Sequence, residues 1–577
     1  MSRLLSALRS YIPLIDQLAS YDTSMLRGDL SAGLTVGVML IPQGMAYALI
    51  AGLPPIYGLY ASLVPLVGYA IFGTSGQLAV GPTALISLLV AASVAPIADG
   101  DPDRYIALSL LLAFMVGVLQ LAMGLLRFGF LVNFLAHPML SGFTSAAAFI
   151  IGFSQLNHLL GVDIERSNYV HEIIGEAVGQ IGAIHTPTLL LGLASIGLLI
   201  ALKRWADKIP GALVAVVVTT VAVWAFGLHE GGMDIVGDVP SGLPAPVWPV
   251  FALDVIQALL PGALVIAFVG FMESMAVAKV YAMRNRYAID ANHELIGLGL
   301  ANAAGALFQA FPTTGGFSRT AVNADAGSKT TLATILSAGV IGFTLLLLTP
   351  LFYYMPNAVL AAIVIVAVTG LFDWEEALYL WKVDRRDLGL MGITFAATLG
   401  LGIEEGLAVG VVASIVAVIY QSSTPHTATM GRLPETTTYR DVSHHEEATA
   451  PDGVAIARMD ADLYFANVSA FKDLIADLDR DHAELRAIVV DMYPVNRVDS
   501  TATHALHQII DDYRAKEIDV YLAGVKAPVH QRLLRAGVVH QLGPDHLYHE
   551  VHDAVQAAGE TSGDAGAPSE VTADLSA

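Results

Sequence analysis

The stretch Phe-Pro-Thr-Thr-Gly-Gly-Phe-Ser-Arg-Thr-Ala-Val-Asn, residues 311–323, places an arginine among small residues, with long apolar segments on either side. An arginine at the depth of a bilayer costs several kcal/mol, so such a residue is usually paired or functional. The stretch also opens with Pro312 and a glycine pair, which is typical of an extended lead-in to a half-helix. We therefore expect Arg319 to mark a short polar crossing.

A second stretch has the same character. Val80-Gly81-Pro82-Thr83 opens an apolar run with a proline in the first helical turn, where its missing N–H costs nothing. Two interrupted segments in corresponding places of two halves predict inverted repeats, with a substrate site where the half-helix N-termini meet. Exposed N–H groups and the positive end of a helix suit an anion. Arg319 would then be a charge partner for the substrate.

The composition indicates a polytopic membrane protein followed by a soluble domain. Of the 577 residues, 55% are hydrophobic and 14% are charged, and the apolar residues form runs of about 18 to 25 up to residue 421. After Gln421 the sequence has mixed charge and short apolar runs. With a short polar crossing at 312–327, about 14 spans are expected, at 30–50, 56–73, 80–97, 105–126, 130–153, 188–202, 211–228, 255–278, 294–309, 331–349, 357–372, 389–403 and 405–421.

Charge asymmetry between the loops predicts that both termini lie in the cytoplasm. The first 29 residues form a segment without the pattern of a cleavable signal peptide. Alternate loops then gather basic residues, as at 203–208 and 382–386, while the opposite loops are acidic, as at 99–103 and 230–238. This asymmetry requires the stretch with Arg319 to cross the membrane. An even number of crossings places the soluble domain inside.

Several features exclude other classes of protein. The absence of cysteine excludes disulfides, thiolate catalysis and cysteine metal sites. A formal net charge of -22 argues against a nucleic-acid partner, and residues 559–577 have the composition of a disordered acidic tail. The histidines are predicted to be surface residues without metal-site spacing, among them His444, His445, His504, His507, His540 and His546.

Four motifs spread over nearly the whole chain are highly specific when taken together. They are Gly-Leu-Thr-Val-Gly-Val-Met-Leu-Ile-Pro-Gln-Gly-Met-Ala-Tyr-Ala at 33–48, Pro-Pro-Ile-Tyr-Gly-Leu-Tyr-Ala-Ser at 54–62, Ala-Val-Gly-Pro-Thr-Ala at 79–84 and Ser-Arg-Thr-Ala-Val-Asn at 318–323. In these residues the chain resembles the SulP or solute-carrier-26 anion transporters. The resemblance implies a seven-plus-seven inverted repeat with a core and a gate domain over residues 30–425. It also implies elevator-like alternating access, a homodimer in membrane lipid, and neither cofactor nor catalytic residues.

Carried over residue by residue, the resemblance implies a pocket for a small anion built from three segments. Gln43 and Tyr47 are four residues apart and so share one helical face. The bland alternative for this pair is hydrogen bonding between helices. The other pocket residues implied are Thr83, Phe317, Ser318 and Arg319.

Glu273 lies inside an otherwise apolar span, where burial disfavours a charged carboxylate. It is expected to be a proton-coupling group, or a cation ligand as in sodium-coupled members. Val277 replaces the threonine that accompanies the acidic residue in the sodium-coupled bicarbonate members, which weakens the sodium interpretation. The structural alternative is a salt bridge from Glu273 to Arg319. Gly76 is a second departure, because many members carry a basic residue there.

From about residue 451 to 558 the chain alternates short strands and helices, after an expected linker at 426–450. The run Val-Asp-Ser-Thr-Ala at 498–502 resembles the STAS domain, an α/β module that is expected to lie in the cytoplasm. Asp499 and Ser500 are predicted to cap the following helix. Thr501 lies where related antagonists are phosphorylated, although Ala502 replaces their glycine. A regulatory role for these residues, and a cytoplasmic partner, is the sharper hypothesis.

Taken together, the sequence predicts a secondary transporter of the inner or plasma membrane. The expected activity is proton-coupled symport or exchange of a small anion such as sulfate, bicarbonate or a dicarboxylate. The alternatives are a sodium-coupled bicarbonate transporter, an anion channel, and a sensor that reports anion occupancy. Transport of uncharged nucleobases is disfavoured, since Arg319 would then have no anion to meet.

Overall fold

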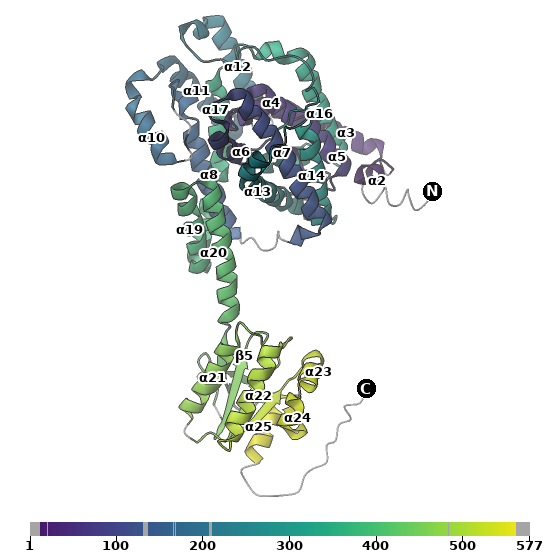
Figure 1. The fold of residues 1–577 in the computed structure, drawn as a ribbon, viewed down its shortest axis with the longest axis vertical. Coiled ribbons are helices and arrows are strands. Elements are labelled where there is room, and N and C mark those ends of the chain that lie inside the picture. The colour runs from purple at the N-terminus through teal and green to yellow at the C-terminus, as the bar shows by residue number, and fades with distance from the viewer. Residues whose placement is uncertain are drawn as a thin grey trace. The chain divides into compact units, whose positions relative to one another are not determined.

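The structure is a computed structural model that describes residues 12–19, 21–130, 137–164, 167, 169–206, 210–449, 451–482 and 484–560. The chain divides into two compact units, Met1–Ser414 and Ile415–Ala577. The first unit is almost entirely helical, and the second combines helices with a sheet (Figure 1).

Every apolar run predicted as a span contains a helix of the first unit or the helix that leads out of it. Among the described residues, nine helices are long and apolar enough to cross a membrane, and α6 and α12 are shorter apolar helices. The total of about 14 spans stays a prediction. The helices are α2 Pro13–Ala19, α3 Thr23–Ile50, α4 Pro55–Ala61, α5 Val64–Phe72, α6 Ala84–Ala98, α7 Pro102–Leu125, α8 His137–Ser154, α9 Leu156–Leu160, α10 Val170–Gly179, α11 Thr186–Trp205, α12 Gly211–Phe226, α13 Leu253–Asn285, α14 Ala291–Ala306, α15 Phe317–Asp325, α16 Leu332–Phe343, α17 Asn357–Val368, α18 Trp374–Val383, α19 Arg385–Leu401 and α20 Ile403–Ser423.

The two interrupted segments form the lead-in strands that their proline and glycine residues predict. Strand β1, Val80–Gly81, pairs antiparallel with β2, Thr314–Gly315, so that Val80 lies opposite Gly315. Helix α6 begins three residues after β1 ends, and α15 begins two residues after β2 ends. The antiparallel pairing brings the two half-helix N-termini together, as inverted repeats require.

Small residues let the helices of the first unit approach closely. At the crossing of α3 and α4, a Cβ built on Gly58 would lie 1.9 Å from the carbonyl oxygen of Gly44. At the crossing of α7 and α14, a Cβ built on Gly117 would lie 2.4 Å from the backbone nitrogen of Ala303. Close backbone contact at small residues is the usual means of packing membrane helices.

The second unit is a six-stranded sheet with helices on both faces. The strand order is β4-β3-β5-β6-β7-β8, and the strands from β5 to β8 are parallel, which requires the helical connections observed. Helices α21 to α24 share one apolar cluster with the sheet, and α25 shares the other. The elements are β3 Thr427–Arg432, β4 Tyr439–Asp441, β5 Val454–Met459, α21 Val468–Asp481, β6 Ala487–Asp491, α22 Ser500–Arg514, β7 Asp519–Ala523, α23 Ala527–Arg535, α24 Val538–Leu542, β8 Leu547–Tyr548 and α25 Val551–Glu560.

Helices and strands occur in two segments that were expected to lie outside the two domains. The expected linker at 426–450 contains β3 and β4, and β3 pairs antiparallel with β5, so this segment extends the sheet. Helix α3 begins at Thr23, within the segment expected to precede the first span. Helix α25 includes residues 559 and 560, and the rest of the expected acidic tail lies outside the described residues.

Replacing Gly58 by alanine should lower the thermal unfolding temperature of the purified protein. The added methyl group would meet the backbone of Gly44, which cannot rotate away, and overpacking of this kind costs about 1–3 kcal/mol. Gly175→Ala is the matched control, because nothing lies within 4 Å of a Cβ built there. Equal unfolding temperatures for the two variants would contradict the close crossing of α3 and α4.

Candidate functional site

The pairing of β1 with β2 is held from both sides by buried hydrogen bonds. The Ser274 hydroxyl on α13 accepts from the Gly315 N–H at 2.8 Å and donates to the Thr314 hydroxyl at 2.7 Å, since that hydroxyl donates to the Gly270 carbonyl. Across the pair, the Ala79 N–H donates to the Thr320 hydroxyl at 3.1 Å. Because each group is buried and satisfied, the strand pair is a rigid platform.

An amide cluster anchors the lead-in to β2. The side-chain amide oxygen of Asn302 (Oδ1), on α14, accepts from the Thr313 N–H at 2.7 Å. Its amide nitrogen donates to the Gln120 side chain on α7 at 3.0 Å, and Gln120 donates to the Ala267 carbonyl on α13 at 3.1 Å. Three helices therefore position the backbone that leads into α15.

Arg319 is buried directly beside this platform, with 2% of its surface exposed. Its Nη1 donates to the Pro82 carbonyl oxygen, which ties α15 to the lead-in of α6. Its Nε and Nη2 have no hydrogen-bond partner among the described residues. Cβ atoms built on Gly81 and Gly316 would lie 3.4 Å and 3.1 Å from Nη2, so the two glycines leave room for the guanidinium. A buried cation with two unsatisfied donors calls for an anionic partner.

Glu273 is the carboxylate that interacts electrostatically with Arg319, but it does not form an ion pair with it. Glu273 and Arg319 interact electrostatically, but the ion pairs of the described residues, counted to 4.0 Å, do not include this pair. The half-buried carboxylate instead accepts from the Thr83 hydroxyl at 3.4 Å. The alternative of a Glu273–Arg319 salt bridge is therefore wrong, because the strand pair holds the guanidinium against Pro82.

Thr83, Gln43 and Tyr47 are the pocket residues that the sequence implies outside α15. Thr83 is the N-cap of α6 and accepts from the Ile86 N–H at 3.5 Å. Gln43 and Tyr47 are buried one turn apart on α3, and Tyr47 interacts electrostatically with Arg319. Within the described residues neither side chain makes a hydrogen bond to another helix, and the side-chain amide oxygen of Gln43 (Oε1) has no partner. The alternative of hydrogen bonding between helices is therefore wrong for this pair.

Phe317 and Ser318 form the first turn of α15, and both are exposed. The N-cap residue Gly316 supplies no side-chain hydrogen bond, so the first N–H groups of α15 remain available to a ligand. The structure thus brings Tyr47, Thr83, Glu273 and Arg319 together, with Gln43 one turn away and Phe317 and Ser318 at the rim. Their roles in substrate binding stay predictions.

The two departures from the family pattern have structural counterparts. Val277 is fully buried in an apolar cluster and offers no oxygen near Glu273. A Cβ built on Gly76 would lie 2.8 Å from the Lys329 carbonyl oxygen, so a basic side chain does not fit this loop without a shift.

The loop that resembles the STAS motif has the predicted helix cap, through one of its two candidate residues. Asp499 is the N-cap of α22, where its carboxylate accepts from the Ala502 N–H at 2.8 Å and from the Phe465 N–H at 2.9 Å. Ser500 and Thr501 are exposed in the first turn. Capping therefore rests on Asp499, and phosphorylation of Thr501 stays a prediction.

Sequence reasoning missed the residues that position the site. Ser274, Asn302 and Gln120 are polar residues within apolar segments, and that pattern is itself a signal for hydrogen bonding between membrane helices. The Pro82 carbonyl carries no sequence signal, because every residue has one.

Ser274→Ala should lower both thermal stability and affinity for the transported anion. The Gly315 N–H would lose its acceptor, and an unsatisfied buried donor costs about 1–3 kcal/mol. Ser87→Ala is the matched control, since this buried hydroxyl on α6 has no partner among the described residues. If thermal unfolding and ligand binding of the two variants were alike, Ser274 would not hold the platform.

Comparison with known proteins agrees with this architecture. The sequence profile of the Sulfate permease family matches residues 26–394, and that of the STAS domain matches residues 446–554. Sulfate transporter 4.1, chloroplastic, of Arabidopsis thaliana is 42% identical over 546 residues, covering 92% of this chain and 79% of the relative. A probable sulfate transporter of Mycobacterium tuberculosis is 35% identical over 548 residues, covering 95% of this chain and 98% of the relative.

Two solved structures share the fold. The murine solute carrier 26 family member A9 anion transporter, in the inward-facing state, matches with a TM-score of 0.89 and 26% identity, over 96% of this chain and 95% of its own. The transmembrane domain of a cyanobacterium bicarbonate transporter, BicA, matches with a TM-score of 0.60 and 27% identity, over 68% and 98%. The resemblance drawn from four motifs is confirmed. The chain belongs to the sulfate permease family, a family of membrane transporters rather than enzymes, and it carries a STAS domain.

Proposed function

We propose that this protein is a secondary active transporter of a small anion, with sulfate as the first candidate substrate. The observation that carries the proposal is the buried Arg319 guanidinium, which has two unpartnered donors beside the N-termini of α6 and α15. A guanidinium, two helix N-termini and nearby hydroxyl groups together replace the water shell of an anion and offset its charge. We assign Gln43, Tyr47, Thr83, Phe317, Ser318 and Arg319 to this pocket.

Sulfate is the first candidate because the relatives that match nearly the whole chain are named as sulfate transporters. Bicarbonate is the second candidate, because the BicA transmembrane domain shares the fold and is named as a bicarbonate transporter. Sodium coupling is disfavoured for this chain, since hard cations prefer oxygen ligands and Val277 is buried among apolar side chains.

We propose that Glu273 is the proton-coupling group, because it interacts electrostatically with Arg319 without forming an ion pair with it. A charged carboxylate close to the guanidinium competes with the substrate for the positive charge, and a protonated one does not. Protonation of Glu273 and binding of an anion at Arg319 therefore favour each other. Each transported anion would therefore be accompanied by a proton on Glu273.

The rigid anchoring of the site supports an elevator-like mechanism. The strand pair is hydrogen bonded to α13 and the lead-in to β2 to α14, so we expect the part of the pocket formed by α6 and α15 to move as one body with these helices. We place the protein in the inner membrane, and the charge asymmetry of the loops supports an orientation with both termini in the cytoplasm. We also propose a homodimer, which rests on the family resemblance.

Arg319→Ala should reduce sulfate affinity at least tenfold, since charge-assisted hydrogen bonds contribute about 1.5–3 kcal/mol and about 1.4 kcal/mol is tenfold. Binding to the purified full-length protein is measured by titration calorimetry, with unfolding temperature as the check on folding. Arg104→Ala is the matched control, because Arg104 pairs with Asp99 at an exposed position. If Arg319→Ala retained the affinity for sulfate, the assignment of Arg319 to the anion pocket would be wrong.

Glu273→Gln should abolish stimulation of sulfate uptake by an inward proton gradient and leave sulfate binding at neutral pH intact. Amide nitrogen and oxygen mimic the size of the carboxyl group but do not exchange a proton. Uptake of labelled sulfate, bicarbonate and succinate into proteoliposomes is compared with and without a proton gradient, and then with a sodium gradient. An unchanged proton effect in the variant would remove Glu273 from coupling, and stimulation by sodium would favour the bicarbonate alternative.

A further inference from the structure

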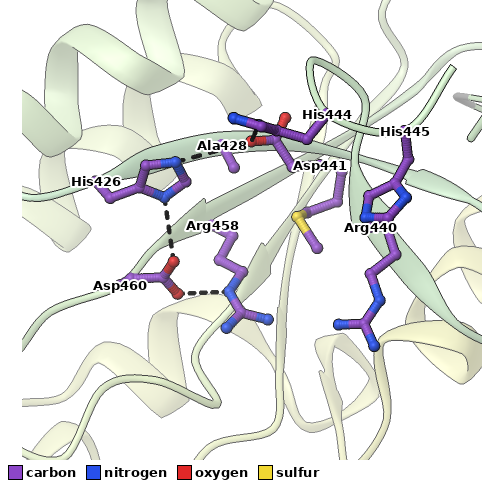
Figure 2. A pocket seen from close by; sticks show the side chains of 9 residues that line it. His426, Ala428, Arg440, Asp441, His444, His445, Arg458 and Asp460 are labelled. Atoms are coloured by element: carbon purple, nitrogen blue, oxygen red, sulfur yellow. Dashed lines mark hydrogen bonds and ion pairs between the residues drawn. The ribbon is translucent and has the colours of Figure 1, made fainter.

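The second unit contains a pocket of about 260 Å³ that is separate in sequence from the residues of the transport site. It is formed by β3, by the end of β4 with the turn that follows, and by the end of β5 (Figure 2). Ala428 of β3 lies opposite Arg458 of β5 in the sheet, so the two side chains share one face. His426, at the start of the pocket, follows the end of α20 at Ser423 by three residues.

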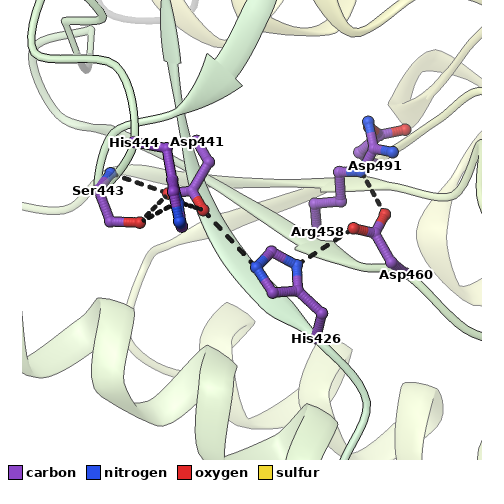
Figure 3. A network of polar contacts seen from close by, with 7 residues as sticks. All are labelled: His426, Asp441, Ser443, His444, Arg458, Asp460 and Asp491. Atoms are coloured by element: carbon purple, nitrogen blue, oxygen red, sulfur yellow. Dashed lines mark hydrogen bonds and ion pairs between the residues drawn. The ribbon is translucent and has the colours of Figure 1, made fainter. Parts of the chain in front are cut away.

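The two carboxylates of the pocket are already engaged by neighbouring residues (Figure 3). Asp441 accepts from the Ser443 hydroxyl at 2.7 Å and from the Ser443 N–H at 2.8 Å, and it contacts the His444 Nδ1 at 3.0 Å. The bonds from Ser443, with those from His444, lower the pKa of Asp441 to about 2. Asp460 accepts from the Arg458 Nε at 2.6 Å and contacts the His426 Nδ1 at 3.2 Å.

The basic side chains of the pocket keep unused hydrogen-bond donors. The Arg440 guanidinium and the His445 ring line the pocket and have no hydrogen-bond or ion-pair partner among the described residues. Arg458 uses Nε on Asp460 and Nη1 on Asp491 at 3.5 Å, which leaves its Nη2. Figure 2 shows the three side chains around the pocket. An imidazole donates a hydrogen bond in either protonation state, and a guanidinium matches the geometry of an oxyanion.

The size of the pocket limits its occupant. Pockets for drug-sized ligands measure roughly 300–1,000 Å³, so this pocket, at about 260 Å³, fits a smaller group. A cation would meet carboxylates that are already paired, and the free Arg440 guanidinium would repel it. We propose that this pocket is a binding site for a small oxyanion, with Arg440, His445 and Arg458 as its donors. The anion is either free sulfate or phosphate, or the phosphate of a lipid headgroup.

Occupancy would add a cross-link between β4, with the turn that follows it, and β5, beside the existing pairing of β3 with β5. Arg440 belongs to β4 and His445 to the turn, Arg458 belongs to β5, and a shared anion cross-links them. The segment that connects α20 to the sheet would then be restrained by the same ion. This inference is independent of the transport site, because all the residues of the pocket belong to the second unit and Arg319 belongs to the first.

The test is hydrogen exchange of the full-length protein, measured by mass spectrometry with sodium sulfate against sodium chloride at equal ionic strength. We expect at least twofold slower exchange with sulfate in peptides that cover 426–446, and no change in peptides that cover β6 and β7. Arg319→Ala should keep this protection, which separates the inference from the proposed function. The inference would be overturned by equal exchange in sulfate and chloride together with equal exchange with and without vesicles of anionic phospholipid.

Variants and lipids identify the donors and the source of the anion. Arg440→Gln combined with His445→Gln should lose the protection, while Arg432→Gln should keep it, because Arg432 lies on β3 outside the pocket and donates to the Thr436 carbonyl. Arg440→Lys should retain part of the protection, and unchanged β6 and β7 exchange reports that each variant is folded. Protection by vesicles of anionic phospholipid, and not by free sulfate, would assign the site to a lipid phosphate. Protection that survives the double variant would refute the assignment of donors.

Discussion

The site depends on one contact, the hydrogen bond from the Arg319 guanidinium to the Pro82 carbonyl oxygen. This contact joins the half-helix α15 to the lead-in of α6, and it occupies one side of a buried cation. The short antiparallel pair of β1 and β2 makes the contact possible, since it brings two segments more than 230 residues apart into register. A guanidinium held in this way retains two free donors, and its burial makes an anion the natural complement.

The surrounding polar groups explain why the arrangement is stable within an apolar protein. Ser274 and Asn302 satisfy backbone N–H groups that the irregular lead-in strands would otherwise leave unpaired. Non-helical backbone is tolerated at membrane depth only where such partners exist or where it lines a cavity. The same bonds attach the pocket to the long helices α13 and α14. Substrate binding and large-scale movement can therefore involve the same rigid body.

The sequence predicts what is local and leaves out what depends on distance. Proline and glycine at 81–82 and 312–316 predict the extended lead-ins, because proline fixes its own backbone angle and glycine permits conformations that other residues rarely adopt. The alternative of a Glu273–Arg319 salt bridge fails because two opposite charges in a sequence carry no information on their separation. The segment with β3 and β4 was expected to be a linker, and it joins the sheet through the pairing of β3 with β5 and of β4 with β3. The role of the Pro82 carbonyl and the donors of the pocket in the second unit can be recognised only in the folded chain.

A density map of the full-length protein with saturating sulfate, compared with a sulfate-free sample at the same ionic strength, tests the central claim most directly. The account predicts a new tetrahedral feature at the N-termini of α6 and α15, within hydrogen-bond distance of Nε or Nη2 of Arg319. Sulfate bound elsewhere in the first unit, with the two donors of Arg319 still unpartnered, would contradict it.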